Sequence, residues 1–251
     1  MVLGTDGVVR AEFDESWTSL RGVHGGYATA IAVRAAEALA PGRAVRTVAM
    51  SFLRPAEVGA AEVVLEVARH GRSITPLEGA IRQGDRVAST VRVTLTAPTA
   101  PGPANEWSSP PLDRPVPFEQ CVRFTPPPMI RHFEHADVRL DPATIPGDGG
   151  EARVAGHVRS LDGRPVDAAW LAMVGDWFPP TPFRRLTPPT GGVSVDYTVH
   201  IHRLPEPGDV RWLEGVFAAR TSSGGLALEH GTLASADGLL LAETFHTRWT
   251  A

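Results

Sequence analysis

The chain has 251 residues, and its 43 % hydrophobic and 21 % charged fractions are typical of a globular protein. A formal net charge of −4 argues against nucleic acid or an anionic membrane as a partner. No stretch approaches the roughly 18 consecutive apolar residues of a membrane span, and the initial MVLGTDGVVRAEF lacks the basic and apolar regions of a signal peptide. The lone cysteine, Cys121, excludes an internal disulfide, so we expect a cytoplasmic protein.

The first part of the chain predicts a strand, a helix and then several strands. VVRAEF (8–13) alternates apolar and polar residues, as a half-buried strand does. HGGYATAIAVRAAEAL (24–39) is rich in alanine and is closed by Pro41-Gly42, which predicts a helix with a defined start and stop. Residues 44–97 alternate again in short runs broken by turn residues, which predicts a meander of antiparallel strands.

The second part repeats this order after a proline-rich stretch. Proline is dense over residues 98–128 and disfavours both helix interiors and central strands there, which predicts a linker. A strand is expected within 129–140 and a helix over 164–178, capped by Asp167 and ended by Pro179. Residues 192–250 again predict strands joined by turns.

Short sequence patterns also recur at corresponding positions: SFLRP and GDRVAST in the first part correspond to HIHRLP and DGLLLAET in the second. This indicates an internal duplication, with repeats over 1–97 and 129–251. A long antiparallel sheet must bury one face, and a helix wrapped by the sheet is an economical way to do so. We therefore predict an α+β chain of two tandem repeats, each with a long central helix wrapped by an antiparallel sheet, sharing a composite sheet.

These features resemble the double hot-dog fold of the bacterial type II acyl-CoA thioesterases. The resemblance rests on GVHGGYATAIAVRAA, AMSFLRPAEVGAAEVVLEV, LAMVGDWFPP and SVDYTVHIHR, and it covers nearly the whole chain apart from the linker. It implies hydrolysis of an acyl-CoA thioester in a cleft between the repeats, with CoA as part of the substrate and no separate cofactor or metal. It leaves room for a homo-oligomer of double hot-dog chains.

The resemblance also implies a catalytic set of an aspartate, a hydroxyl residue and a glutamine that together position a water molecule. The aspartate would be Asp176 and the hydroxyl would be Ser194. The glutamine would fall at or near His246, where this sequence departs from the family pattern. Imidazole both donates and accepts hydrogen bonds, so His246 is a reasonable substitute.

Asp176 lies close to the end of the apolar run AAWLAMVGDWFPP (168–180). The negative end of its own helix and its apolar neighbours both lead us to expect a raised pKa, as suits a general base. Nine residues into the first helix the corresponding position is Ala35, so only one of the two quasi-equivalent sites carries the acid. A solvated aspartate at a helix end is the alternative interpretation.

His24, Gly25 and Gly26 begin the first helix, and we expect them to contact substrate. The first N–H groups of a helix lack internal partners and could polarise the thioester carbonyl. The alternative is a turn that simply requires glycine.

Other chemistries are weaker alternatives. We favour water over a serine nucleophile, because no nucleophile-elbow motif surrounds Ser194. His200 and His202 share a strand face but lack an evident third ligand, so no metal site is expected. An enoyl-CoA hydratase or dehydratase of the same fold remains open, as does a non-catalytic acyl-CoA- or lipid-binding protein.

Overall fold

The computed structural model describes residues 1–4, 7–98, 107–111, 113–186, 191–206 and 212–250. The α-helices are α1 (Gly25–Leu39) and α2 (Ala168–Val174). The strands, in chain order, are β1 (Val2–Leu3), β2 (Val9–Phe13), β3 (Thr18–Ser19), β4 (Gly22–Val23), β5 (Ala44–Phe52), β6 (Gly59–Val67), β7 (Ile74–Gln83), β8 (Arg86–Thr96), β9 (Val122–Arg123), β10 (Ala136–Leu140), β11 (Arg153–Ser160), β12 (Val193–Ile201), β13 (Leu213–Ser223), β14 (Leu226–Ser235) and β15 (Leu240–Trp249).

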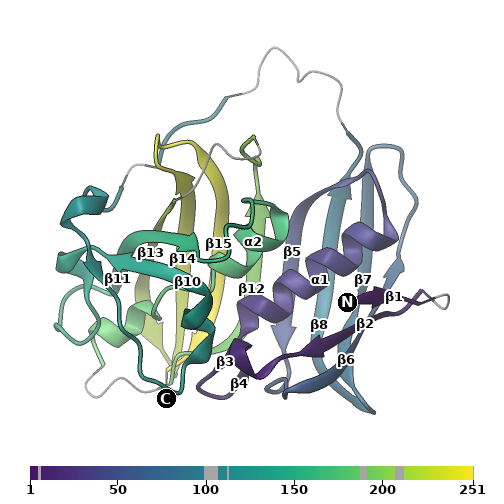
Figure 1. The fold of residues 1–251 in the computed structure, drawn as a ribbon, viewed down its shortest axis with the longest axis horizontal. Helices are drawn as coiled ribbons and strands as arrows, with labels where there is room; N and C mark the ends of the chain where they lie inside the picture. The colour runs from purple at the N-terminus through teal and green to yellow at the C-terminus, as the bar shows by residue number, and fades with distance from the viewer. Residues whose placement is uncertain (5–6, 99–106, 112, 187–190, 207–211, 251) are drawn as a thin grey trace.

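One antiparallel sheet runs through both parts of the chain. Among the described residues it has 13 strands, in the order β1-β2-β6-β7-β8-β5-β12-β15-β14-β13-β11-β10-β9. β5 and β12 pair at the centre, with Tyr197 opposite Met50, and so join the two halves (Figure 1). From that pair outward, the two halves have the same strand order. The last strand of the half comes next, then the third and the second strand after the helix, and then a strand that precedes the helix. These are β8, β7, β6 and β2 in the first half and β15, β14, β13 and β11 in the second. The predicted duplication and the composite sheet are therefore visible in the topology.

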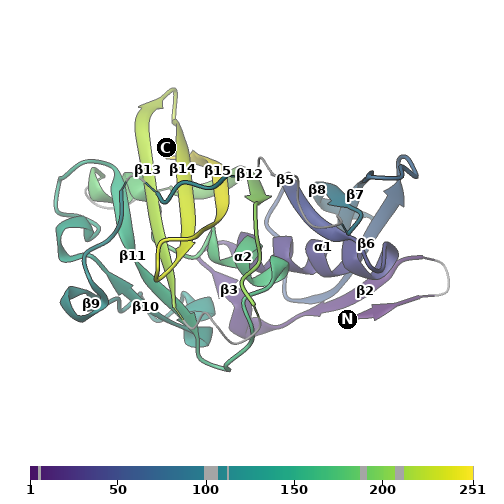
Figure 2. The same ribbon diagram turned by 90° about the horizontal axis from the view of Figure 1, so that it is seen from above.

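α1 matches the predicted helix closely. His24 caps its N-terminus, where the ring accepts a hydrogen bond from the Tyr27 N–H, and the backbone leaves the helix at Ala40. The side chains of Ala32, Ala35 and Ala36 are fully buried, because their small size lets the helix lie close to its neighbours. α1 lies against the first half of the curled sheet and α2 against the second (Figures 1 and 2).

The second helix is much shorter than predicted. The sequence predicted a helix over 164–178, whereas α2 has seven residues, so the expected long central helix in each repeat is wrong for this half. Asp167 does cap the helix, accepting from the Trp170 N–H at 2.8 Å. Gly175 ends it, and residues 175–177 continue as turns before the proline pair. All seven helical residues are buried, so packing on every side maintains a helix of this length.

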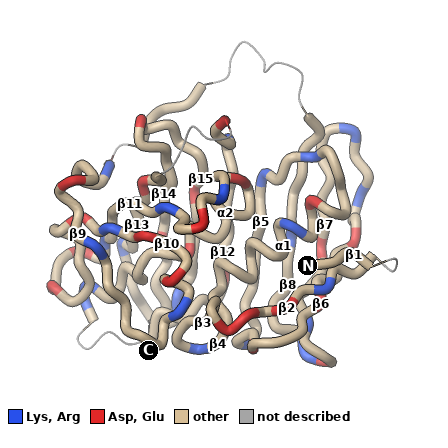
Figure 3. Tube along the Cα trace, in the orientation of Figure 1, with Lys and Arg blue, Asp and Glu red and all other residues tan. Residues whose placement is uncertain are grey.

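Five of the described strands were not predicted from the sequence, and the two-residue strands β1, β3 and β4 are three of them. β11 lies in a segment for which no element was predicted, and β9 lies inside the predicted linker, where it pairs with β10. Residues of both charge signs are spread over both halves of the fold (Figure 3). Neither helix in the described part of the chain is long and apolar enough to cross a membrane.

A single hydroxyl ties the sheet to the end of α2. Tyr197, on β12, is fully buried, and its Oη donates to the Ala172 backbone oxygen at 2.8 Å. We expect Tyr197→Phe to lower the free energy of unfolding by about 1–2 kcal/mol, because the carbonyl would stay buried without its donor. Urea denaturation measures this change.

Tyr27→Phe is the matched control, because the Tyr27 ring stacks on Trp17 while its hydroxyl has no hydrogen bond to the described residues. It should shift the free energy of unfolding by less than about 0.5 kcal/mol. Equal losses in the two variants would contradict the assignment of a stabilising role to the Tyr197 hydroxyl.

Candidate active site

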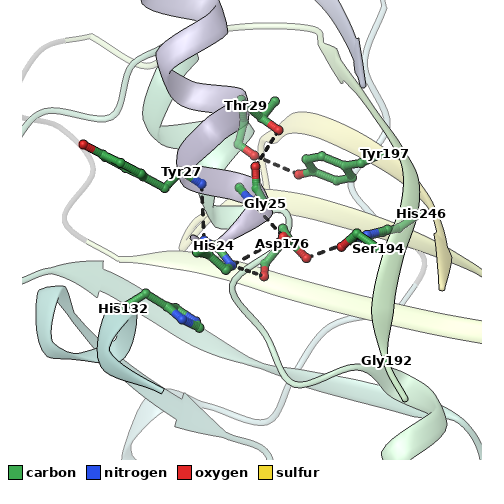
Figure 4. Close-up of polar contacts among 12 residues, drawn as sticks. His24, Gly25, Tyr27, Thr29, His132, Asp176, Gly192, Ser194, Tyr197 and His246 are labelled. Carbon is green, nitrogen blue, oxygen red and sulfur yellow. Dashed lines mark hydrogen bonds and ion pairs between the residues drawn. The ribbon is translucent and has the colours of Figure 1, made fainter. Parts of the chain in front are cut away.

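The predicted site residues meet where the two halves join. His24, Gly25 and Gly26 form the N-terminus of α1, Asp176 follows α2, Ser194 lies near the start of β12, and His246 lies on β15. Figure 4 shows His24, Gly25, Asp176, Ser194 and His246 close together at the first turn of α1. Every candidate named from the sequence therefore contributes to one cluster, built from both repeats.

Asp176 is held by the helix of the other repeat. Its Oδ2 accepts a hydrogen bond from the Gly26 N–H at 2.9 Å, and its Oδ1 accepts from Arg248 Nη2 at 3.2 Å. The carboxylate thus faces the positive end of the α1 dipole, whereas the sequence placed it only at the negative end of its own helix. Gly26 permits this approach, because a Cβ there would overlap the Met173 carbonyl oxygen and press on Asp176.

The expected rise in the pKa of Asp176 is wrong. Burial raises this pKa, as the sequence analysis assumed, but His246, His24 and the Arg248 guanidinium outweigh burial and lower the pKa to about 2. The cause of the error is that the charged and polar partners come from distant parts of the chain. Asp176 is consequently a carboxylate at neutral pH and a weak base.

Both ring nitrogens of His24 form hydrogen bonds with backbone groups. Nδ1 accepts from the Tyr27 N–H at 3.3 Å, so Nε2 carries the proton and donates to the Asp176 backbone oxygen at 2.8 Å. The ring stacks on His132 with 4.0 Å between centroids. Burial lowers the pKa of both histidines, although Asp176 opposes this effect. The neutral His24 therefore couples the cap of α1 to the backbone of Asp176.

Ser194 and His246 form a direct contact, with 2.8 Å between Ser194 Oγ and His246 Nε2. On the other side of the ring, His246 Nδ1 lies 3.4 Å from Asp176 Oδ1. Burial, with a smaller contribution from Arg248, lowers the pKa of His246 to about 4 in spite of the carboxylate. The imidazole is thus neutral at physiological pH.

A β-bulge places Ser194 in the site. Tyr197 pairs with His246 and Ser194 pairs with Arg248, so Val195 is an extra residue on β12. Side chains alternate along a strand, so without the extra residue Val195 would face inward and Ser194 outward. With the bulge, Val195 is exposed and Ser194 points to the same side of the sheet as His246.

Arg248 and Glu229 also belong to the site, although they were not predicted from the sequence. The Arg248 guanidinium is buried and bridges two carboxylates, with Nη2 3.0 Å from Glu229 Oε1 and 3.2 Å from Asp176 Oδ1. Glu229 Oε2 in turn accepts from the Thr181 N–H. Strand periodicity could have indicated Arg248, because it lies two residues after His246 and shares its face.

Gly25 leaves one backbone donor available. The Gly26 N–H is taken by Asp176, but the Gly25 N–H has no acceptor among the described residues. Gly25 is half-buried, and a Cβ there would lie 2.9 Å from Asp176 Oδ2 and 3.1 Å from the Phe52 ring. The absence of a side chain keeps this donor accessible beside the carboxylate.

Within the part of the chain that the structure describes, no group of three or more histidine, cysteine or acidic side chains could hold a metal ion. His202, one of the two histidines considered as metal ligands, has its Nε2 2.9 Å from Glu243 Oε2.

Comparison with known structures shows the hot-dog fold. A hot-dog protein from Alicyclobacillus acidocaldarius, described as a conserved protein of unknown function, matches with a TM-score of 0.85 at 24 % identity, covering 100 % of this chain and 96 % of that one. The tesB protein of Mycobacterium avium gives 0.78 at 18 % identity, with 97 % and 93 % covered. The acyl-CoA thioesterase II TesB2 of Mycobacterium marinum gives 0.73 at 19 % identity, with 98 % and 93 % covered.

Comparison with protein families is more specific. Residues 13–98 match the acyl-CoA thioesterase N-terminal domain, and residues 97–249 match the acyl-CoA thioesterase C-terminal domain. The chain therefore belongs to the acyl-CoA thioesterase family, whose members are thioester hydrolases. A search of curated proteins by sequence finds no match.

The low pKa of His246 predicts a pH-dependent stability. The unfolded chain binds a proton on this histidine below about pH 6.5, whereas the folded chain does so only near pH 4, so stability falls as the pH drops through that window. The lowered pKa of Asp176 also contributes stability, but this contribution is lost only below about pH 4, which lies outside the pH range of the experiment. Between pH 7.5 and pH 4.5 we expect the wild type to lose about 2 kcal/mol more than His246→Gln.

Urea denaturation of both proteins at the two pH values measures the difference. The other buried histidines are common to both proteins, so their contributions cancel. The same pH dependence in the two proteins would show that His246 is not held neutral by the fold.

Proposed function

We propose that this chain hydrolyses acyl-CoA thioesters at the cluster of Asp176, His246 and Ser194. The observation that carries the proposal is the continuous series of contacts from Ser194 Oγ through the His246 ring to the Asp176 carboxylate, beside the N-terminus of α1. It combines a hydroxyl, a neutral base and a fixed anion with a free N–H donor, which are the groups that acyl transfer requires. Membership of the thioesterase family supports the thioester as substrate.

From the sequence, proton abstraction from water was expected of Asp176, and the geometry favours His246 instead. Asp176 is 5 % exposed, its oxygens already accept hydrogen bonds, and its pKa of about 2 makes it the weaker base. His246 is neutral, and its Nε2 faces the hydroxyl. We therefore assign the proton transfer to His246 and the positioning of the ring to Asp176.

The two carboxylates of the cluster partly offset the burial and the Arg248 charge, which together disfavour a proton on His246. Arg248 lies between two carboxylates, so the group of Asp176, Glu229 and Arg248 carries one net negative charge when both acids are ionised. An imidazolium formed beside this group is attracted to its two carboxylates in a buried, low-dielectric environment. The buried anions therefore lower the free energy of the protonated state that the reaction requires.

The developing negative charge on the thioester carbonyl has a candidate partner in the Gly25 N–H. This donor lies at the positive end of α1, where a partial positive charge adds to the hydrogen bond. Of the predicted substrate-binding residues, we therefore assign carbonyl binding to Gly25. Gly26 and His24 hold Asp176 through the contacts described above. No cofactor or metal takes part in this scheme, and the cytoplasmic location stays a prediction.

Asp176→Asn tests the proposal, because the amide has the shape of the carboxylate without its charge. We expect kcat for free-thiol release to fall at least about 100-fold with little change in KM, since the variant loses stabilisation of the imidazolium and keeps the binding surface. The substrates are acetyl-, hexanoyl- and palmitoyl-CoA, and thiol release is followed by a colorimetric reagent.

Asp196→Asn is the matched control. Asp196 lies two residues beyond Ser194 on β12 and is half-buried, and its side chain forms no hydrogen bond or ion pair with the described residues, so the variant should keep the wild-type rate. Identical rates for wild type and Asp176→Asn on every substrate would refute the assignment. A loss of enoyl absorbance with crotonyl-CoA without thiol release would identify a hydratase, and saturable binding without turnover would identify a binding protein.

A further inference from the structure

We propose that Ser194 is a nucleophile, so that the reaction passes through a covalent acyl-serine. This inference rests on the proposed function and concerns how the thioester is cleaved. It reverses the preference for water that the sequence alone suggested, because the base that a serine needs comes from β15 and the acid from the segment after α2. Neither lies near Ser194 in the sequence.

The three side chains form a linear relay. Ser194 Oγ lies 2.8 Å from His246 Nε2, and His246 Nδ1 lies 3.4 Å from Asp176 Oδ1. This is the order of groups found in serine hydrolases, in which the hydroxyl gives its proton to a histidine held by a carboxylate. The Nδ1 separation is longer than an ideal hydrogen bond, as catalytic contacts often are before substrate binds.

The charge of Asp176 sets the direction of the hydrogen bonds. A proton on Nδ1 faces a carboxylate, whereas a lone pair on Nδ1 would face the same carboxylate and be repelled. The stable neutral tautomer therefore carries its proton on Nδ1. Nε2 is then an acceptor, and Ser194 Oγ–H donates to it, which is the arrangement that activates a hydroxyl.

Exposure decides which of the three groups a substrate can reach. His246 is 0 % exposed and the Asp176 side chain is 5 % exposed, whereas Ser194 is half-buried. A water molecule activated by His246 would need to replace Ser194 at Nε2, since the hydroxyl already occupies that position. Ser194 is thus the least buried member of the relay.

The bulge in β12 supports the same conclusion. One extra residue, Val195, turns Ser194 to the inner side of the sheet and sends an apolar side chain outward. An exposed valine and an irregular strand are unfavourable for a sheet without another purpose, and bulges often reorient a side chain at an active site.

The reaction balances without any further reagent. Ser194 Oγ forms a bond to the thioester carbon while its proton moves to His246 Nε2, and the Gly25 N–H stabilises the oxyanion. The carbon–sulfur bond then breaks, and the thiolate of CoA takes the proton from His246. A water molecule repeats the sequence on the acyl ester, giving the free acid and restoring the Ser194 hydroxyl.

An alkyl fluorophosphonate tests the nucleophile independently of acyl-CoA turnover. We expect one probe per chain, attached to Ser194 by peptide mass spectrometry, and no labelling of Ser194→Ala. His246→Gln should slow labelling at least about 100-fold, because glutamine keeps a polar group at this place but cannot take the proton. Ser51→Ala, an exposed serine of the adjacent strand β5, should label like the wild type. No labelling of the wild type would overturn the proposal.

The acyl-enzyme itself is tested by partitioning between water and hydroxylamine. For one acyl group carried by CoA, by N-acetylcysteamine or by p-nitrophenol, a common acyl-serine gives the same ratio of hydroxamate to acid whatever the leaving group. Ratios that differ between leaving groups, with Ser194→Ala keeping a tenth or more of the wild-type rate, would indicate direct attack by water. That result refutes the acyl-serine and leaves thioester hydrolysis intact, whereas no thiol release from any acyl-CoA refutes the hydrolysis.

Discussion

The position of the Asp176 carboxylate is the constraint on which the rest of the site depends. An anion at 5 % exposure is unfavourable without compensation, and here the compensation comes from the Gly26 N–H, the positive end of α1 and the Arg248 guanidinium. These partners require α1 and α2 to touch, which in turn requires glycine at position 26. The fixed charge then orients the His246 ring, and the ring orients Ser194. One buried anion is therefore in contact with the helix start of the first repeat and with Arg248 and His246 of the second.

The site depends on both repeats being parts of one continuous sheet. The helix start comes from the first repeat, and the acid, the base and the hydroxyl come from the second. The pairing of β5 with β12 holds these parts in register, since a slip of one residue would turn the side chains of a strand to the other face. The first repeat, in which Ala35 occupies the position that corresponds to the acid, contributes the N–H groups and the positive end of α1 without a second carboxylate.

Much of this arrangement could be predicted from sequence, and the failures have a common cause. α1, the cap at Asp167 and the order of strands follow from local patterns of alanine, glycine, proline and alternating apolar residues. Asp176, Ser194 and His246 were found through a family resemblance. The length of α2, the low pKa of Asp176 and the role of Arg248 depend on residues far away in the chain. No local pattern contains that information, so these features became evident only in three dimensions.

The extra residue in β12 has a consequence for comparing this chain with its relatives. Val195 changes which residues before it face the interior, so position-by-position matching through β12 pairs unlike side chains unless a one-residue gap is placed between Ser194 and Asp196. A relative without the bulge would carry its inward hydroxyl one place closer to Tyr197. The same inner surface can thus be kept while the inward hydroxyl moves by one place in the sequence.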